Sequence, residues 1–124
     1  MDRIRLIASD MDATLLDEQS QLPADFEETI HALAELGIRF APASGRPLYT
    51  LEAMFPTLQD ELVFIGDNGG AIRWKGQNLF TSEMSPEGWR ALNRLTREQG
   101  DIAVLCGKSI VADPLRRGNT GDNT

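Results

Sequence analysis

Two aspartates separated by one residue are the clearest candidates for chemistry in this sequence. Asp10 and Asp12 lie in the segment IASDMDATLLD, directly after a short apolar run. In a locally extended chain their carboxylates point the same way, and such a pair repels unless one is protonated or a cation lies between them. Oxygen ligands of this kind suit Mg²⁺, which also binds phosphate oxygens. We therefore predict that Asp10 and Asp12 bind Mg²⁺ in a phosphoryl-transfer site; the alternative is that they only cap the following turn.

A second candidate segment is formed by Ser44, Gly45 and Arg46, which precede a predicted helix that begins at Pro47. Backbone N–H groups and the Ser44 hydroxyl at a helix N-terminus can bind a phosphate, and Arg46 can add a charge-assisted hydrogen bond. The alternative is that Ser44 is a turn residue and Arg46 a solvated charge. Asn68 is a third candidate, although an Asn followed by Gly is also a common turn.

The elements that position these residues follow from the apolar pattern. Ile4–Ser9 shows almost no polar alternation, which is typical of a strand covered on both faces. Further strands are predicted at Ile38–Ala43 and Leu62–Ile65, with helices between Pro23 and Gly37 and between Pro47 and Pro56. This alternation predicts an α/β fold with a Rossmann-like parallel sheet. The three candidate segments then meet at the carboxyl edge of the sheet, where α/β proteins bind ligands.

The pattern changes after Gly70. A hairpin is predicted from Ala71–Trp74 and Asn78–Thr81, and a helix from the N-cap Ser85 to Gly100. Two short strands are expected at 102–106 and 109–112, and the tail at 116–124 has no apolar residue and is expected to be disordered. We predict a core domain at 1–82, part of a second, α+β domain at 83–115, and the tail.

Composition excludes several classes of protein. The formal net charge of -7 argues against a nucleic-acid partner, because such proteins use surplus cations against phosphates. Apolar runs are too short for a membrane span, and the N-terminus lacks a signal peptide pattern. Cys106 is the only cysteine, which excludes an internal disulfide and fits a reducing compartment. We therefore expect a cytoplasmic protein.

Three segments together resemble one known family. IRLIASDMDATLLD, APASGRP and FIGDNGGAI are similar to motifs of the haloacid dehalogenase-like superfamily, and within it of the Cof-type sugar-phosphate phosphatases. The resemblance implies a partial core of that family, followed by the beginning of its α+β cap domain. It implies that Asp10 is the nucleophile that forms an aspartyl-phosphate and that Asp12 is the acid/base. It further implies that Ser44 binds the phosphoryl oxygens, with Mg²⁺ at the Asp10 carboxylate and Asp12 carbonyl.

The sequence departs from this family in two ways. Ala13 stands where the family usually has glycine, and neither the family's later lysine nor its later acidic motif is matched by Lys108 or by 121–123. Because the chain ends inside a cap-like region, we expect a fragment, a truncated product or a protein completed by another chain. Two hypotheses follow: a magnesium-dependent phosphatase of small phosphorylated metabolites, or an inactive remnant with a weak metal or phosphate site or a structural role. Self-association through exposed sheet edges is also expected.

Overall fold

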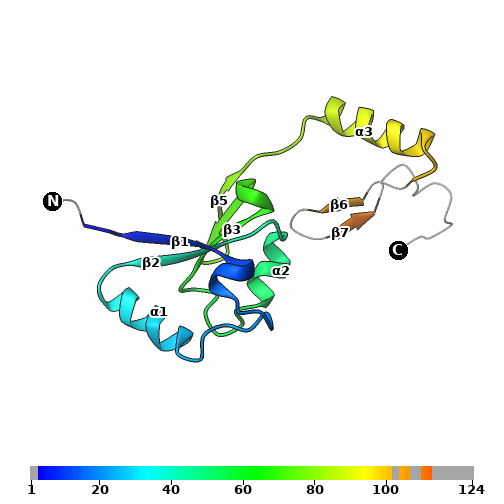
Figure 1. Cartoon of the computed structure of the whole chain (residues 1–124). Helices are drawn as coiled ribbons and strands as arrows, with labels where there is room; N and C mark the ends of the chain where they lie inside the picture. The colour runs from blue at the N-terminus through cyan, green and yellow to red at the C-terminus, as the bar shows by residue number, and fades with distance from the viewer. Residues whose placement is uncertain (1–2, 102–103, 107–109, 113–124) are drawn as a thin grey trace. The chain divides into compact units, whose positions relative to one another are not determined.

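A computed structural model describes residues 3–101, 104–106 and 110–112 of the chain. It divides into two compact units, Met1–Ser82 and Glu83–Thr124. The first unit contains a five-stranded sheet with the strand order β1-β2-β3-β4-β5 (Figure 1). The strands are β1 (Leu6–Asp10), β2 (Arg39–Ala43), β3 (Val63–Gly66), β4 (Ala71–Trp74) and β5 (Gln77–Thr81).

The first three strands are parallel and are joined by helices. α1 (Phe26–Glu35) connects β1 to β2, and α2 (Leu48–Ala53) connects β2 to β3, whereas β4 and β5 are antiparallel to their neighbours. The predicted α/β fold with a parallel sheet is therefore confirmed. Strand and helix ends lie within a few residues of the predicted ones, and α2 begins at Leu48 with Pro47 as its N-cap residue rather than as its first residue.

Helix α1 ends where the sequence predicts, for a local reason. Gly37 has a φ of 75°, in the left-handed region that glycine enters without steric cost. The Ile38 N–H donates to the Leu33 carbonyl oxygen at 2.9 Å, and the Gly37 N–H donates to that of Ala34 at 3.0 Å. These two bonds form a Schellman motif, which satisfies the last carbonyls and turns the chain into β2.

The hydrophobic core of the first unit lies between the helices and one face of the sheet. Rings from α1, from β3 and from the segment after α2 meet there: Phe55 lies 5.6 Å from Phe26 and 6.1 Å from Phe64, measured between ring centroids. Both helices contribute to the same buried cluster, so they cover the same face of the sheet (Figure 1). The buried members are Met11, Leu16, Phe26, Ile30, Leu48, Leu51, Phe55, Leu58, Leu62, Phe64 and Ala71.

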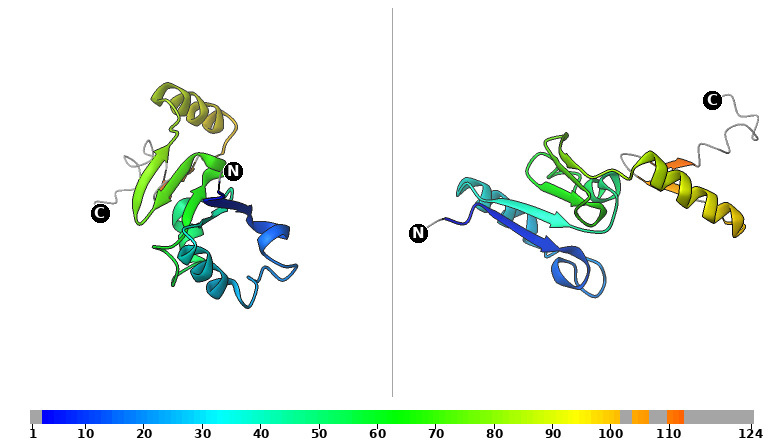
Figure 2. Two further views of the ribbon diagram at one scale, coloured as in Figure 1. Left: turned by 90° about the vertical axis from the view of Figure 1, so that its left-hand side faces the viewer. Right: turned by 90° about the horizontal axis from the view of Figure 1, so that it is seen from above.

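The first strand does not have the double coverage that its apolar sequence predicted. β1 lies at the edge of the sheet with only β2 beside it (Figure 2), and the exposed fractions are 69% for Ile4 and 53% for Leu6. Burial on two faces requires a layer on each, and the two α-helices described in this unit, α1 and α2, share one face. The prediction of a strand covered on both faces is therefore wrong for this structure.

The hairpin that ends the first unit turns through two residues. Lys75 has a φ of 50° and Gly76 a φ of 74°, and positive φ at both central residues is what a type I′ turn requires. This turn pairs Trp74 with Gln77 and fixes the antiparallel register of β4 and β5. The predicted hairpin is therefore present, with β5 starting one residue earlier than expected.

The second unit contains a helix and a short antiparallel pair. α3 (Pro86–Glu98) begins as predicted, because the Ser85 hydroxyl oxygen accepts the Gly88 N–H at 3.0 Å. β6 (Val104–Cys106) pairs with β7 (Ile110–Ala112). The interpretation of the two units as core and cap stays a prediction, and the expected tail at 116–124 lies outside the described residues. Within the described part of the chain, no helix is both long and apolar enough to cross a membrane.

Candidate active site

The register of the parallel strands brings the three candidate segments to one edge of the sheet. Asp10, the last residue of β1, is paired with Ala43, and Ala43 is paired with Ile65 on β3. Ser44 follows β2 directly, and the turn Asp67–Gly69 follows β3. Because parallel strands end on the same side, the segments that leave them converge there.

A pocket of about 300 Å³ opens at this edge. It is lined by residues from the ends of all three parallel strands and from the loops after β2 and β3: Asp10, Ala43, Ser44, Gly45, Ile65, Asn68 and Gly69. Of the candidate residues, Asp12 and Arg46 are not part of this lining. They lie beside it, since Arg46 is hydrogen-bonded to Ser44. The structure thus brings every candidate residue of the sequence into one neighbourhood.

The turn after β1 separates a core residue from an exposed acid. Met11 is fully buried, whereas the Asp12 side chain is 68% exposed, and Asp12 has extended backbone angles. Ala13 follows with a φ of 58°, in the left-handed region, so this position favours the glycine that the sequence lacks. Asp10 occupies the N-cap position of this turn without a side-chain capping bond. The alternative that Asp10 serves only as a cap therefore has no hydrogen bond to support it.

In the second segment the Arg46 side chain connects Ser44 to Asp12. The Ser44 hydroxyl oxygen accepts the backbone N–H of Arg46 and its Nη1–H, each at 3.1 Å, and Arg46 Nη2–H donates to Oδ1 of Asp12 at 3.1 Å. The Ser44 backbone N–H donates to the Ile65 carbonyl oxygen at 3.0 Å. Two of the backbone donors expected to face a phosphate, those of Ser44 and Arg46, are therefore used within the protein.

The third segment is fastened to the second by its backbone. The Asn68 N–H donates to the Ser44 carbonyl oxygen at 3.0 Å, and the Asp67 N–H donates to that of Arg46 at 2.9 Å. Both Asp67 and Asn68 have positive φ, 51° and 54°. Sequence reasoning singled out Asn68 but missed Asp67; the run Asp-Asn-Gly was the available signal, because these residue types tolerate left-handed backbone best.

The donor set at this edge fits a hard divalent cation. Asp10 lines the pocket, and its carboxylate accepts none of the hydrogen bonds found among the described residues, so its oxygens are available to a cation. No group of three or more potential metal-ligating side chains occurs in the described part of the chain. Mg²⁺ is commonly held by one or two carboxylates, with water and substrate phosphate completing its shell. The Asp10 carboxylate fits that pattern, and the Asp12 carboxylate remains available for another role.

A comparison with protein-family models matches residues 7–114 to a family described as haloacid dehalogenase-like hydrolase. This match includes all three segments at the carboxyl edge of the sheet and continues through α3. It covers well over half of the chain.

Individual relatives share this similarity. A 5-amino-6-(5-phospho-D-ribitylamino)uracil phosphatase of Escherichia coli is 35% identical over 86% of this chain and 40% of its own. An HMP-PP phosphatase of Cronobacter sakazakii is 36% identical over 67% and 31%. A crystal structure of a protein from Geobacillus kaustophilus superimposes with a TM-score of 0.72 and 30% identity over 86% of this chain and 41% of that one. The chain spans less than half the length of these relatives.

Proposed function

Because this chain belongs to the haloacid dehalogenase-like hydrolases, we propose that it carries the phosphoryl-transfer site of a magnesium-dependent phosphatase of the Cof type. One observation carries the proposal: Asp10 lines a small pocket together with Ser44 and Asn68. Two relatives have names that describe phosphatases of phosphorylated compounds. These names support a phosphomonoester of a small metabolite as the substrate class.

The proposed reaction has two displacements. A carboxylate oxygen of Asp10 attacks phosphorus, the bond to the leaving alcohol oxygen breaks, and Asp12 donates a proton to that oxygen. Asp12 then removes a proton from a water, which attacks the aspartyl-phosphate, so that inorganic phosphate leaves and the Asp10 carboxylate is restored. The Ser44 hydroxyl and the Asn68 side-chain amide are the donors proposed to stabilise the charge that develops on the phosphoryl oxygens.

Bound Mg²⁺ would neutralise the negative charge that the phosphate brings to two carboxylates. The residues that would hold it are Asp10, through its carboxylate, and Asp12, through its carbonyl oxygen. Since the whole chain has a formal net charge of -7, a local cation is also a means of admitting an anionic substrate. Removal of divalent cations by a chelator is therefore expected to abolish hydrolysis, and added Mg²⁺ to restore it.

A second function is supported by a different observation. Within the described residues the site offers two carboxylates and no larger group of metal-ligating side chains. A protein of this kind with a weak metal or phosphate site, or a purely structural role, fits these facts too. A weak site predicts that the chain binds phosphate without hydrolysing a phosphate ester. A purely structural role predicts neither binding nor hydrolysis.

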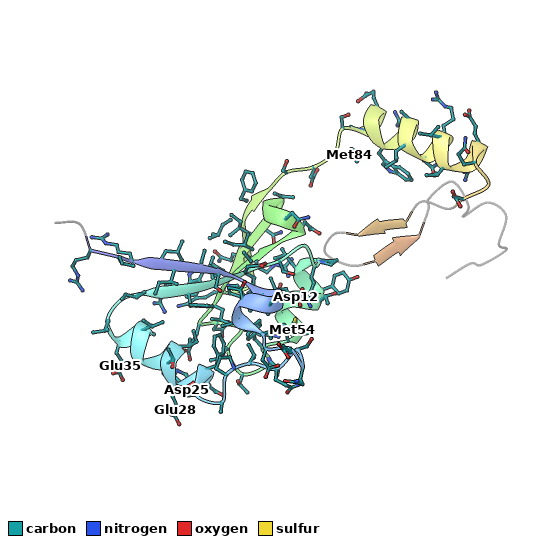
Figure 3. All side chains as sticks on the ribbon, viewed as in Figure 1. Asp12, Asp25, Glu28, Glu35, Met54 and Met84 are labelled. Atoms are coloured by element: carbon teal, nitrogen blue, oxygen red, sulfur yellow. The ribbon has the colours of Figure 1, made fainter. Side chains whose placement is uncertain are left out.

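The test is hydrolysis of p-nitrophenyl phosphate with and without Mg²⁺ by the unmodified chain and by Asp10→Asn. Asp25→Asn is the matched control, since Asp25 is exposed at the start of α1 (Figure 3) and makes no side-chain capping bond. We expect magnesium-dependent hydrolysis by the unmodified chain and the control, and background rates for Asp10→Asn. Equal rates for all three proteins would contradict the catalytic proposal and leave the second function.

The proposal also includes the setting in which the protein acts. We infer a cytoplasmic protein without a nucleic-acid partner, on the support of its single cysteine and its acidic charge. Its substrate is a diffusible phosphorylated metabolite, which an enzyme of the cytoplasm meets in solution. Fractionation of cells that express the chain, followed by detection of it in each fraction, tests the location.

A further inference from the structure

The Arg46 guanidinium holds two groups of the proposed site at once. Its Nη1–H donates to the Ser44 hydroxyl oxygen and its Nη2–H to Oδ1 of Asp12, both at 3.1 Å. The Arg46 side chain is 29% exposed, whereas that of Asp12 is 68% exposed. A planar guanidinium with a fixed fork of donors can make both bonds with one geometry, which a lysine ammonium on a flexible stem does not reproduce.

The bonds to Ser44 determine which way its hydroxyl can act. A serine hydroxyl has two acceptor lone pairs and one O–H donor. The backbone N–H and the Nη1–H of Arg46 occupy both lone pairs of the Ser44 oxygen. Among the hydrogen bonds of the described residues, none is donated by the Ser44 hydroxyl. Its remaining capacity is therefore donation, which is the capacity that a phosphoryl oxygen requires.

The bond to Asp12 determines which oxygen can exchange a proton. Oδ1 of Asp12 accepts from Arg46, and this is its one hydrogen bond among the described residues. Oδ2 is left for the leaving-group oxygen or the attacking water. Without the bond, an exposed side chain on a turn would sample several rotamers. Figure 3 shows Asp12 on this turn, at the end of β1.

The Arg46 main chain is itself anchored. Its carbonyl oxygen accepts the Asp67 N–H at 2.9 Å, and its N–H is bonded to Ser44. The residue that connects Asp12 to Ser44 therefore starts from a backbone fixed by the loop after β3. A side chain fixed at its base loses less conformational entropy when it holds two partners than a freely moving one.

We propose that Arg46 is a positioning residue. It orients the Ser44 hydroxyl to donate a hydrogen bond to phosphate, and it holds Asp12 so that Oδ2 is directed to the reacting group. This inference rests on the proposed function for the roles of Ser44 and Asp12. It differs from the sequence interpretation, in which Arg46 binds phosphate directly. It also differs from a role of Arg46 in stability alone.

The first test needs binding but no turnover. The affinity for inorganic phosphate in the presence of Mg²⁺ is measured by calorimetry for the unmodified chain, Ser44→Ala, Arg46→Gln and the double variant. If Arg46 acts through Ser44, each single substitution weakens binding by about tenfold, and the double variant is little weaker than Ser44→Ala. Direct phosphate binding by Arg46 predicts losses that multiply in the double variant, and that result overturns the proposal.

Arg46→Lys separates charge from geometry in the same experiment. It keeps the positive charge but not the fork, so we expect it to bind phosphate almost as weakly as Arg46→Gln. Retention of the unmodified affinity by Arg46→Lys would contradict a positioning role and favour a simple charge effect. Arg5→Gln is the control, because it removes one positive charge from an exposed residue whose side chain makes none of the bonds above. Its affinity is expected to be unchanged.

The second test examines Asp12 through the leaving group. The value of kcat/KM is compared for p-nitrophenyl phosphate, whose leaving group departs without a proton, and for glycerol phosphate, whose alcohol needs one. Arg46→Gln is expected to lower the value for glycerol phosphate at least tenfold more than for p-nitrophenyl phosphate. Equal losses for both substrates would contradict the positioning of Asp12.

Different results would contradict the positioning role of Arg46 and the proposed phosphatase function. Phosphate binding without any turnover contradicts the catalytic function. The phosphate affinities of the unmodified chain, the two single variants and the double variant still decide the role of Arg46. No measurable phosphate binding by the unmodified chain overturns both. Thermal unfolding of each variant is measured alongside, and a loss of binding that follows a loss of folded protein counts against a positioning role.

Discussion

Asn68 donates its backbone N–H to the carbonyl oxygen of Ser44 at 3.0 Å. This bond joins the loop after β3 to the loop after β2, and the Asn68 side chain lies over Gly45, where a Cβ would approach its Oδ1 to 3.1 Å. Both loops line the same pocket. The shape of the candidate phosphate site is therefore set by the contact between two loops, and small changes at that contact are expected to alter binding.

Gly45→Ala is expected to weaken phosphate binding with little loss of stability. Gly45 does not have a positive φ, so alanine is compatible with its backbone, and the added methyl group meets the mobile end of the Asn68 side chain. Displacement of Asn68 into the pocket should lower the affinity for inorganic phosphate by about tenfold, which is about 1.4 kcal/mol of binding free energy. Calorimetric titration measures the affinity.

Gly66→Ala is the contrasting variant. A Cβ there would lie 3.0 Å from the Arg46 carbonyl oxygen and 3.1 Å from the Leu48 nitrogen, which are backbone atoms. Because backbone cannot move aside cheaply, we expect the free energy of unfolding to fall by about 1–3 kcal/mol. Equal stability losses for Gly45→Ala and Gly66→Ala would contradict the distinction between the two contacts.

Ala13→Gly is expected to stabilise the protein. Ala13 has a φ of 58°, and left-handed backbone costs a residue with a Cβ about 1–2 kcal/mol. Part of this gain is offset by the larger conformational freedom of glycine in the unfolded chain. The free energy of unfolding, from urea denaturation, should therefore rise by about 0.5–1 kcal/mol.

The control for this prediction is Ala32→Gly, on the exposed side of α1. Glycine in a helix interior is unfavourable relative to alanine, so this variant should lose about 1 kcal/mol. The same substitution is thus expected to raise the free energy of unfolding at position 13 and to lower it at position 32. Destabilisation by Ala13→Gly would show that the left-handed conformation of Ala13 carries no cost.

Glu52→Gln is expected to destabilise the packing of α2 against the hairpin. The Glu52 carboxylate pairs with Nη1 of Arg73 on β4, and these side chains are 18% and 15% exposed. Loss of the carboxylate charge leaves a largely buried guanidinium without its ionic partner, which should lower the free energy of unfolding by about 1–3 kcal/mol. Denaturation in urea measures this change.

An exposed pair provides the comparison for that variant. Glu27 lies 3.7 Å from Nε2 of His31 within α1, and the two side chains are 54% and 50% exposed. Solvent screens such a pair, so Glu27→Gln should change the stability by less than about 0.5 kcal/mol. A similar effect of Glu27→Gln and Glu52→Gln would contradict a contribution from burial.

The expected self-association is tested by sedimentation velocity over a range of protein concentrations. β1 is an edge strand with Leu6 53% exposed, and an unpaired strand with apolar side chains is a template for pairing with another chain. We expect association that rises with concentration and is reduced by Leu6→Lys. Leu36→Lys is the control, because Leu36 is 62% exposed but follows a helix. A chain that stays monomeric throughout contradicts this prediction.

The sequence by itself determined the strand order along the chain and the identity of the residues at the strand ends. The local apolar pattern locates the end of a strand to within a residue or two, so Asp10, Ser44 and Asn68 could each be assigned to the end of a strand. Parallel pairing then requires these ends to meet at one edge of the sheet. The pairing of Asp10 with Ala43 places the ends of β1 and β2 side by side at that edge. The meeting of the candidate residues was predictable because it depends on local pattern and a topological rule.

Only the tertiary structure decided how these residues are connected and what covers the sheet. The bond between Arg46 and Asp12 joins residues 34 positions apart, and a side-chain contact over that distance depends on loop geometry that no local pattern encodes. The exposure of Leu6 likewise depends on which layers lie beyond β1, whereas its apolar neighbours in the sequence suggest burial. Asp10 and Asp12 as a pair were visible in the sequence; the arginine that holds one of them became visible only in the fold.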